Sequence, residues 1–310
     1  MIEFKNVWFA YDPREAEKQQ EKTAVQADWG NAPDSLWALS DISFSLHDGE
    51  FFGIAGHTGS GKSTLVRHMN GLLNPTRGQV LVDGVDIANK QAASEARAHV
   101  GLVFQYPERQ LFAANVYEDV AFGPRNMGMP ETEMDTIVSE ALAQVDLSFD
   151  ELRDKSPFEL SGGQQRRVAL AGVLAMKPTT LILDEPAAGL DPAARRELLS
   201  LIKRLHTESS ATIVLISHNM DNLAQLCDRI LVLNTGMLYA LGTPAEVFAD
   251  AQACRNIGLD VPAAQRLANA LIAEGVELDA APGGLYTSEV LVDAITAAYE
   301  RGCATSKEGR

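Results

Sequence analysis

A glycine-rich turn with one lysine is the segment of this sequence that points most directly to chemistry. Residues 56–63 read GHTGSGKS and fit the pattern G-x-x-x-x-G-K-[ST] in full, between a strand pattern and a helix pattern. Glycines let backbone amides face inward around an anion, and the helix start adds partial positive charge. The turn predicts a nucleotide phosphate site, rather than an ordinary strand-to-helix turn, made of Gly56, His57, Thr58, Gly59, Ser60, Gly61, Lys62, Ser63 and Thr64.

Charged and hydroxyl side chains at two places could act on the bound phosphates. In such a turn Lys62 supplies a mobile cation to the β- and γ-phosphates, and the Ser63 hydroxyl can ligate Mg²⁺. Asp184 ends the hydrophobic segment TLILD, where ligands gather in open α/β sheets, and it can hold Mg²⁺ through its water shell. Glu185 follows it and is the candidate that polarises an attacking water.

A third candidate is the segment LSGGQ at residues 160–164, which precedes the helix pattern QRRVAL. Ser161 and the two glycines after it expose amides at a helix start, which is again an arrangement that binds anions. With this segment the chain resembles the ATPases of ABC transporters. In that family the signature faces the γ-phosphate held by the P-loop of a second subunit. The resemblance therefore implies a head-to-tail dimer with ATP between subunits, contacted by Ser161, Gly162, Gly163 and Gln164.

Four further residues match landmarks of the same family. Gln105 matches the Q-loop glutamine, which senses Mg²⁺ and water and touches the membrane partner. Asp191 matches the D-loop residue that crosses the dimer interface, and His218 matches the switch histidine that contacts the γ-phosphate. Tyr11 matches the aromatic residue that stacks on adenine. The resemblance thus implies catalysis by Glu185, His218, Gln105 and Lys62, and a metal site of Ser63, Gln105 and Asp184.

Plainer interpretations remain for the aromatic and histidine residues. Tyr11 could be a tyrosine at a strand end, and His218 a hydrogen-bonded loop histidine. The other histidines outside the turn have no such position in the pattern, and we expect ordinary polar roles for His47, His68, His99 and His206.

A narrower resemblance rests on residues 105–124, QYPERQLFAANVYEDVAFGP, together with LDEPAAGLDP at 183–192. These segments resemble the A components of energy-coupling factor (ECF) transporters, importers of vitamins and transition-metal ions. They favour the second of the two paired A subunits, whose usual mate is a different but homologous ATPase. The resemblance implies a T-type transmembrane scaffold, a substrate-binding S-type membrane protein, and a peripheral position on the cytoplasmic side of the cell membrane. The transported substrate and the choice between homodimer and heterodimer stay open.

Two departures from the family pattern stand out. The loop at 12–36 is longer than usual, which puts the geometry beside Tyr11 in doubt. Ala187 replaces a commoner threonine at a position with no catalytic role in the family scheme.

The elements that must position these residues alternate between strand and helix, which predicts a mostly parallel sheet with helices on both faces. We expect an α/β P-loop NTPase of the ABC ATPase type, with an antiparallel β subdomain, a helical lobe at about 107–176 and a small C-terminal helical appendage. Residues 2–11 predict an edge strand, and 79–85 a hairpin. The expected domains are an ATP-binding domain at 1–250 and a dimerisation appendage at 251–310, with helices after Pro262 and Thr287.

Composition excludes several classes of function. The chain has 310 residues and a net charge of −16, so its surface is a poor match for nucleic-acid phosphates or an anionic membrane leaflet. No segment predicts a membrane-spanning helix or a secretory signal, and the three cysteines lack metal-site spacing.

Competing functions can be ranked from the same patterns. The first is the ATPase of another class of ABC transporter, which changes partner and cargo but not chemistry. Repair and ribosome-acting ABC proteins carry a long coiled coil or two cassettes, whereas this chain has no sustained heptads and one P-loop. A non-catalytic phosphate-binding module or a GTPase switch conflicts with the complete set of acidic, glutamine and histidine landmarks.

Overall fold

The computed structural model describes residues 1–17, 36–279 and 287–308, which form two compact units. The first unit comprises Met1–Glu50 and Ser63–Ile216, and the second comprises Phe51–Lys62 and Ser217–Arg310. The predicted long loop lies mostly outside the described residues, and residues 13–17 form one helical turn. No described helix has the length and apolar character needed to cross a membrane.

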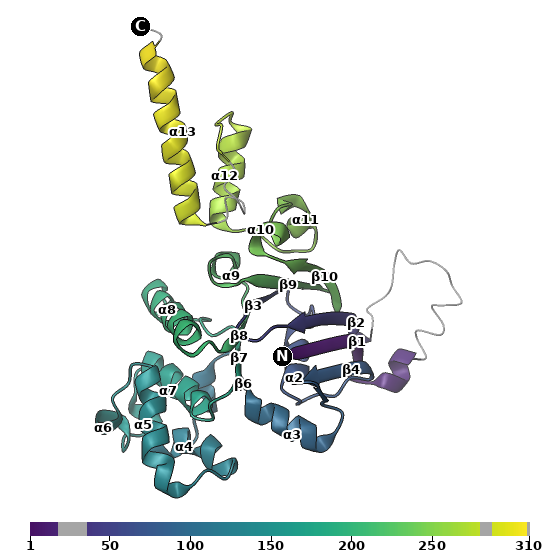
Figure 1. The fold of residues 1–310 in the computed structure, drawn as a ribbon, viewed down its shortest axis with the longest axis vertical. Coiled ribbons are helices and arrows are strands. Elements are labelled where there is room, and N and C mark those ends of the chain that lie inside the picture. The colour runs from purple at the N-terminus through teal and green to yellow at the C-terminus, as the bar shows by residue number, and fades with distance from the viewer. Residues whose placement is uncertain (18–35, 280–286, 309–310) are drawn as a thin grey trace. The chain divides into compact units, whose positions relative to one another are not determined.

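An antiparallel sheet opens the first unit (Figure 1), in the order β2-β1-β4-β5. Its strands are β1 (Ile2–Ala10), β2 (Trp37–Leu46), β4 (Arg77–Val82) and β5 (Val85–Asp86). The predicted hairpin of β4 and β5 is confirmed. The prediction that residues 2–11 form an edge strand is wrong, because β1 pairs with both β2 and β4. Alternation of polar and apolar residues shows which face of a strand is buried, but it does not reveal how many neighbours the strand has.

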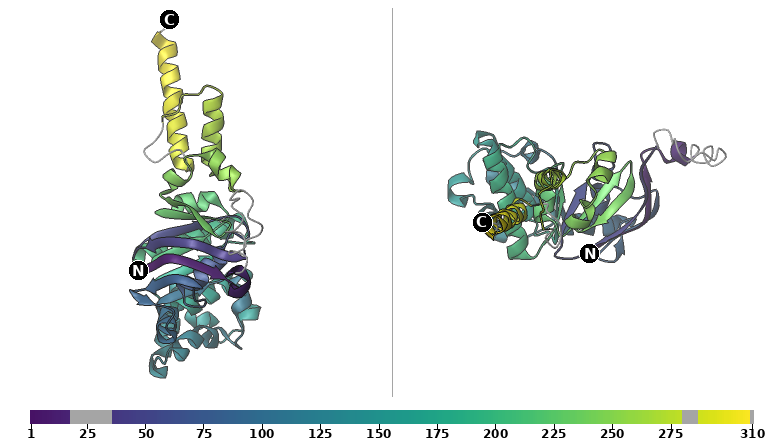
Figure 2. Two further views of the ribbon diagram at one scale, coloured as in Figure 1. Left: turned by 90° about the vertical axis from the view of Figure 1, so that its right-hand side faces the viewer. Right: turned by 90° about the horizontal axis from the view of Figure 1, so that it is seen from above.

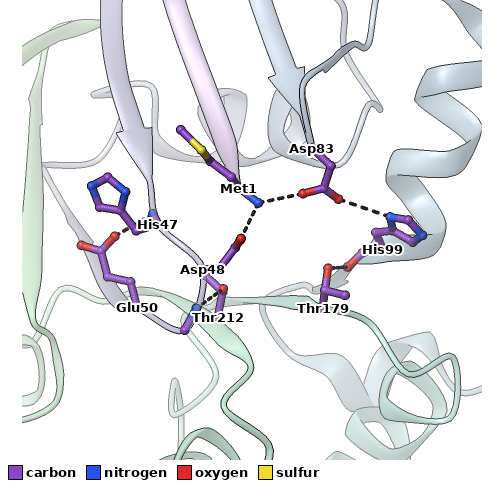
Figure 3. Close-up of polar contacts among 9 residues, drawn as sticks. Met1, His47, Asp48, Glu50, Asp83, His99, Thr179 and Thr212 are labelled. Atoms are coloured by element: carbon purple, nitrogen blue, oxygen red, sulfur yellow. Dashed lines mark hydrogen bonds and ion pairs between the residues drawn. The ribbon is translucent and has the colours of Figure 1, made fainter.

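Hydrogen bonds tie the turn after β2 to the parallel strands of the same unit (Figure 3). The Gly49 amide donates to the Thr212 hydroxyl at 2.9 Å, and the Ile213 amide donates to the Glu50 carbonyl at 3.0 Å. The amino group of Met1 binds Asp48 and Asp83, and Asp83 also faces His99. Burial opposes ionisation of Asp83, but its contacts with the Met1 ammonium and His99 outweigh burial and lower its pKa.

Parallel strands carry the predicted site residues of this unit. They are β6 (Val100–Val103), β7 (Thr180–Asp184) and β8 (Thr212–Ile216), with β7 between the other two. The flanking helices are α3 (Lys90–His99) and α8 (Pro192–Ser209). Every residue of β6 and β8 is buried, as expected for strands covered on both faces. The predicted parallel sheet is confirmed.

A helical lobe follows β6. Its helices are α4 (Val116–Asn126), α5 (Met134–Gln144), α6 (Phe149–Leu152) and α7 (Gly162–Leu174) (Figure 1). Three short 3₁₀ segments join them: η1 (Pro107–Gln110), η2 (Glu131–Glu133) and η3 (Pro157–Glu159). The face of α5 that carries Met134, Ile137, Val138, Ala141 and Leu142 is buried, and α4, α5 and α7 pack together. Apolar residues at helical spacing therefore mark the packed face.

The second unit contains three more strands. Here β3 (Phe51–Ala55) lies parallel to β9 (Arg229–Asn234), and β10 (Met237–Gly242) pairs antiparallel with β9. The helices of this unit are α9 (Met220–Leu226), α10 (Pro244–Val247), α11 (Ala251–Asn256), α12 (Ala263–Ala273) and α13 (Ser288–Glu308).

The last two helices lie side by side (Figure 2), and this confirms the two predicted C-terminal helices. Their shared core is made of Ala264, Ala268, Leu291 and Ala294. The larger apolar residues of α12 point elsewhere, because Leu267 and Ile272 are each 51% exposed. Small residues let two helices approach closely, so the alanines of α12, rather than these larger residues, meet α13.

Two glycines with the same φ angle provide a test of how closely β1 packs against β4. Gly78 and Gly84 both have φ of +80°, but a Cβ on Gly78 would lie 2.2 Å from the Asn6 carbonyl oxygen, whereas Gly84 faces open space. We expect Gly84→Ala to cost about 1–2 kcal/mol from backbone strain alone. Gly78→Ala should cost more, because β1 must also move, and thermal unfolding of the two variants measures the difference. Equal melting temperatures would contradict the packing of β1 against β4.

Candidate phosphate-binding site

The turn between β3 and α2 (Lys62–Met69) is held in shape by backbone contacts within the second unit. A Cβ on Gly56 would lie 2.3 Å from the Ser60 hydroxyl and 2.6 Å from the Leu233 carbonyl oxygen. The Gly236 amide donates to the Ser60 carbonyl at 3.0 Å, so the β9–β10 turn supports this loop. Glycine at position 56 is therefore required by the close approach of backbone, as the sequence pattern predicts.

The predicted phosphate-binding lysine lies inside this turn. The buried Lys62 ammonium donates to the Gly56 carbonyl at 2.7 Å and to the His57 carbonyl at 2.9 Å. His57 braces the loop, because its Nδ1 donates to the Thr58 carbonyl at 2.8 Å and its Nε2 lies 3.2 Å from Asn234 Oδ1. The structure thus brings together the loop residues and their cation, and it gives His57 a supporting contact.

The predicted switch histidine belongs to the same unit as the lysine. Burial lowers the pKa of His218, and the positive charge of Lys62 lowers it further. The imidazole is therefore neutral at physiological pH, and one ring nitrogen can donate while the other accepts. Its electrostatic coupling to Lys62 supports a place beside the phosphates.

The predicted metal ligands and the candidate base belong to the first unit. Ser63 is exposed in the first turn of α2, Gln105 is exposed two residues after β6, and Asp184 is half-buried at the end of β7. Glu185 has a left-handed backbone with φ of 50°, and its amide donates to the Ile216 carbonyl at 3.1 Å. A non-glycine residue in this region costs on the order of 1–3 kcal/mol, and such strain clusters at active sites. Glu185, which chemistry had singled out, is one of nine non-glycine residues with a positive φ in the described part of the chain.

The signature segment presents an open helix start. Ser161 caps α7, and its side chain and that of Gln164 form a reciprocal capping box. Gly162 and Gly163 are exposed, and a Cβ on either would meet nothing within 4 Å. Packing within the described chain therefore does not require glycine at either position.

The D-loop aspartate has a local role that the sequence prediction missed. Asp191 caps α8, accepting hydrogen bonds from the amides of Ala193 and Ala194 at 2.8 and 3.0 Å. These two bonds lower its pKa, so the carboxylate stays charged. An aspartate immediately before a proline-led helix is itself a cap signal. Its predicted contact across a dimer interface remains a prediction.

Tyr11, the predicted adenine-stacking residue, forms an aromatic pair with Phe9 in the first unit. The Tyr11 side chain is 64% exposed, and its hydroxyl lies 3.1 Å from the Thr64 hydroxyl. Its ring meets Phe9 edge to face, with centroids 5.0 Å apart. The exposed ring face is free of the core, as a stacking residue requires.

Arg166 links the signature helix to the segments after Gln105 and Glu185, and the sequence did not predict this role. Arg166 on α7 is buried, and its guanidinium makes two 3.0 Å hydrogen bonds to the Glu108 carboxylate just after Gln105. It also donates to the carbonyls of Pro186 and Ala188, both at 3.1 Å, beyond Glu185. A buried charge must be paired. An arginine among the buried positions of α7 was therefore the feature of the sequence that could have predicted these contacts.

His68 was also misjudged as an ordinary polar residue. It is completely buried on α2, its Nδ1 donates to the Thr64 carbonyl at 2.8 Å, and its ring packs on Phe9 at 4.8 Å. Burial lowers the pKa of His68 below 6.5, although the contact with Thr64 favours the charged form. The residue is a neutral core histidine beneath the phosphate-binding helix.

Substitution of Arg166 should be costly. We expect Arg166→Met to destabilise the chain by about 3 kcal/mol or more, because Glu108 and two carbonyls lose their donor. Arg166→Lys keeps the charge but not the planar fork, so an intermediate loss should appear in thermal unfolding. Arg196→Lys, an exposed substitution on α8, is the matched control, with an expected change below about 0.5 kcal/mol. Equal shifts for the two arginines would rule out the linking role.

The buried histidine predicts a pH dependence of stability. A folded pKa below the unfolded one means that the His68 contribution is complete above 6.5 and is lost as the pH falls. The melting temperature of the wild type should therefore drop more between about pH 7.5 and 5.5 than that of His68→Gln. The exposed His47→Gln variant should keep the wild-type drop. Identical pH profiles for the wild type and His68→Gln would contradict this assignment.

Comparisons with known proteins identify the family. Residues 39–188 match the ABC transporter family. The chain is 51% identical over 273 residues to EcfA2, an energy-coupling factor transporter ATP-binding protein of Symbiobacterium thermophilum, covering 88% of this chain and 91% of the relative. The EcfA1 protein of the same organism is 47% identical over 272 residues, covering 88% and 92%.

Solved structures give the same result. CbiO1 from Clostridium perfringens, described as part of the ABC transporter complex cbiONQ, is 34% identical with a TM-score of 0.69, covering 87% of this chain and 98% of that one. The dimeric bacterial ABC transporter cassette MJ0796 is 28% identical with a TM-score of 0.63, covering 78% and 98%. The chain therefore belongs to the ABC transporter ATPases, as an ATP-binding and ATP-hydrolysing subunit of the energy-coupling factor type.

Proposed function

We propose that this chain is the motor subunit of an ECF importer and couples ATP hydrolysis to uptake of a vitamin or a transition-metal ion. The observation that carries the proposal is the identity of about half to EcfA2 proteins over most of the chain, together with the full set of site residues. The substrate would be recognised by another polypeptide, because the proposed role of this chain ends at the nucleotide.

The residues of the site divide the chemistry between them. The amides of the turn and Lys62 bind the triphosphate, and Tyr11 stacks on adenine. Ser63, Asp184 and Gln105 offer the hard oxygen ligands that Mg²⁺ prefers, so they fit this ion. When bound there, Mg²⁺ would neutralise charge on the phosphates.

Turnover requires a water to be activated next to the γ-phosphate. Glu185 polarises that water, and His218, neutral at physiological pH, hydrogen-bonds the γ-phosphate. Lys62 stabilises the charge that spreads over the transferring group.

A second ATPase completes the site in this proposal. The Ser161 side chain and the exposed amides of Gly162 and Gly163 would face the triphosphate of a homologous subunit, in a heterodimer or a homodimer, and Asp191 would lie at the interface. The appendage at 251–310 would help to hold the pair together, which fits the exposure of Val292 and Tyr299 at 60% and 73%. The dimeric cassette among the structural neighbours supports this arrangement.

A groove in the helical lobe offers a surface for the membrane scaffold. It has a volume of about 520 Å³, is lined largely by α4 and α7, and includes Phe122. Phe112 and Phe122 are exposed and meet edge to face at 4.9 Å. An apolar pair on a surface marks a contact site. We propose that helices of a T-type scaffold dock here, placing the chain on the cytoplasmic side of the cell membrane with an S-type protein.

The role of Glu185 can be tested directly. We expect Glu185→Gln to bind ATP normally but to lose at least about 100-fold in turnover, since a general base contributes roughly 10²–10⁴ in rate. ATP binding and phosphate release should be measured on the assembled transporter. Glu208→Gln, an exposed substitution on α8, should leave both unchanged. Near-normal hydrolysis by Glu185→Gln would remove Glu185 from this role.

The partners can be tested by purification from solubilised membranes. The wild-type chain should recover a homologous ATPase and a small T-type membrane protein. The double variant Phe112→Ser and Phe122→Ser should lose the membrane protein but keep the ATPase, while the exposed Leu72→Ser should keep both. Recovery of the membrane protein with the double variant would exclude this groove, and recovery of neither partner by the wild type would oppose the ECF assignment.

A further inference from the structure

The hydroxyl of Tyr11 has a contact that base stacking does not require. It lies 3.1 Å from the hydroxyl of Thr64, which sits in the first turn of α2. Thr64 is buried, whereas the ring of Tyr11 is largely exposed. The exposed aromatic ring is therefore anchored, through its polar end, to a residue of the phosphate-binding pattern.

Two neighbouring side chains fix both partners of this contact. Phe9 packs edge to face on Tyr11 at 5.0 Å and on His68 at 4.8 Å. His68 in turn donates to the Thr64 carbonyl at 2.8 Å. The four residues form a closed cycle of contacts within the first unit. Thr64 is therefore held through both its backbone and its side chain.

The chemistry of the two hydroxyls determines which of them donates the hydrogen bond. A threonine hydroxyl carries one hydrogen and can accept two more hydrogen bonds. An ionised phosphate oxygen only accepts, so in a hydrogen bond to a bound phosphate the Thr64 hydroxyl would be the donor. The oxygen of Thr64 then remains available to accept from the Tyr11 phenol. The two hydrogen bonds polarise each other and can coexist in the nucleotide complex.

We propose that Tyr11 is a positioning residue for the triphosphate as well as a platform for the base. Its phenol donates to Thr64 and holds the Thr64 hydroxyl in the orientation that donates to a phosphate oxygen. This inference rests on the proposed function, in which residues 56–64 bind the phosphates of ATP. It explains why a tyrosine, rather than a phenylalanine, is useful here, because stacking alone needs no hydroxyl.

A ligand without a base separates the two roles of Tyr11. Inorganic tripolyphosphate with Mg²⁺ cannot stack, so its binding, measured by competition with a fluorescent ATP analogue, reports the phosphate contacts alone. Tyr11→Phe keeps the ring, and we expect it to weaken both ATP and tripolyphosphate by about three- to tenfold, the range of one hydrogen bond. Thr64→Val should cause a similar loss, and adding Tyr11→Phe to Thr64→Val should cause no further loss. Tyr239→Phe, a matched substitution on exposed β10, should change neither affinity.

Two results would overturn the inference while the proposed function stands. One is unchanged tripolyphosphate binding by Tyr11→Phe. The other is additive losses in the double variant, which would mean that the two hydroxyls act independently. Failure of the wild type to bind ATP at all would instead refute the nucleotide site itself.

Discussion

A chain with a net charge of −16 has to hold a triphosphate, and backbone amides are the groups that allow it. Amides carry no net charge, so a turn that points them inward binds an anion without a basic surface. That turn exists only because Gly56 leaves room for the Ser60 side chain and the Leu233 carbonyl. Lys62 is bonded to the carbonyls of Gly56 and His57, which places its cation within the same loop.

Polar contacts from other segments hold this loop and the other site segments in place. The β9–β10 turn bonds to Ser60, and Asn234 holds His57. In the first unit, Arg166 ties the segment after Gln105 to the signature helix and to the loop beyond Glu185. Since breaking a buried charge network costs several kcal/mol, these segments are expected to move together rather than singly. The proposed coupling of nucleotide state to a partner would need such linkage.

The parts of the site that could be predicted from sequence are those encoded locally. The turn at 56–63, the acids after β7 and the capped start of α7 each combine residue types and spacing that chemistry constrains. What could not be predicted depends on contacts between distant segments. The partners of Arg166 lie 58, 20 and 22 residues away, and neither the two neighbours of β1 nor the burial of His68 beneath Phe9 follows from periodicity. The helix after Pro262 was predicted, but its packing on α13 through Ala264 and Ala268 depends on contacts that the sequence does not reveal.

We propose that two segments, the turn at Gly56–Ser63 and the helix start at Ser161–Gly163, grip one triphosphate from separate polypeptides. Sedimentation of the Glu185→Gln chain mixed with its homologous ATPase, with and without ATP, tests this most directly, since ATP is held but not consumed. We predict a two-chain particle that forms only with ATP. Chains that bind ATP to full occupancy and still sediment singly would contradict the claim.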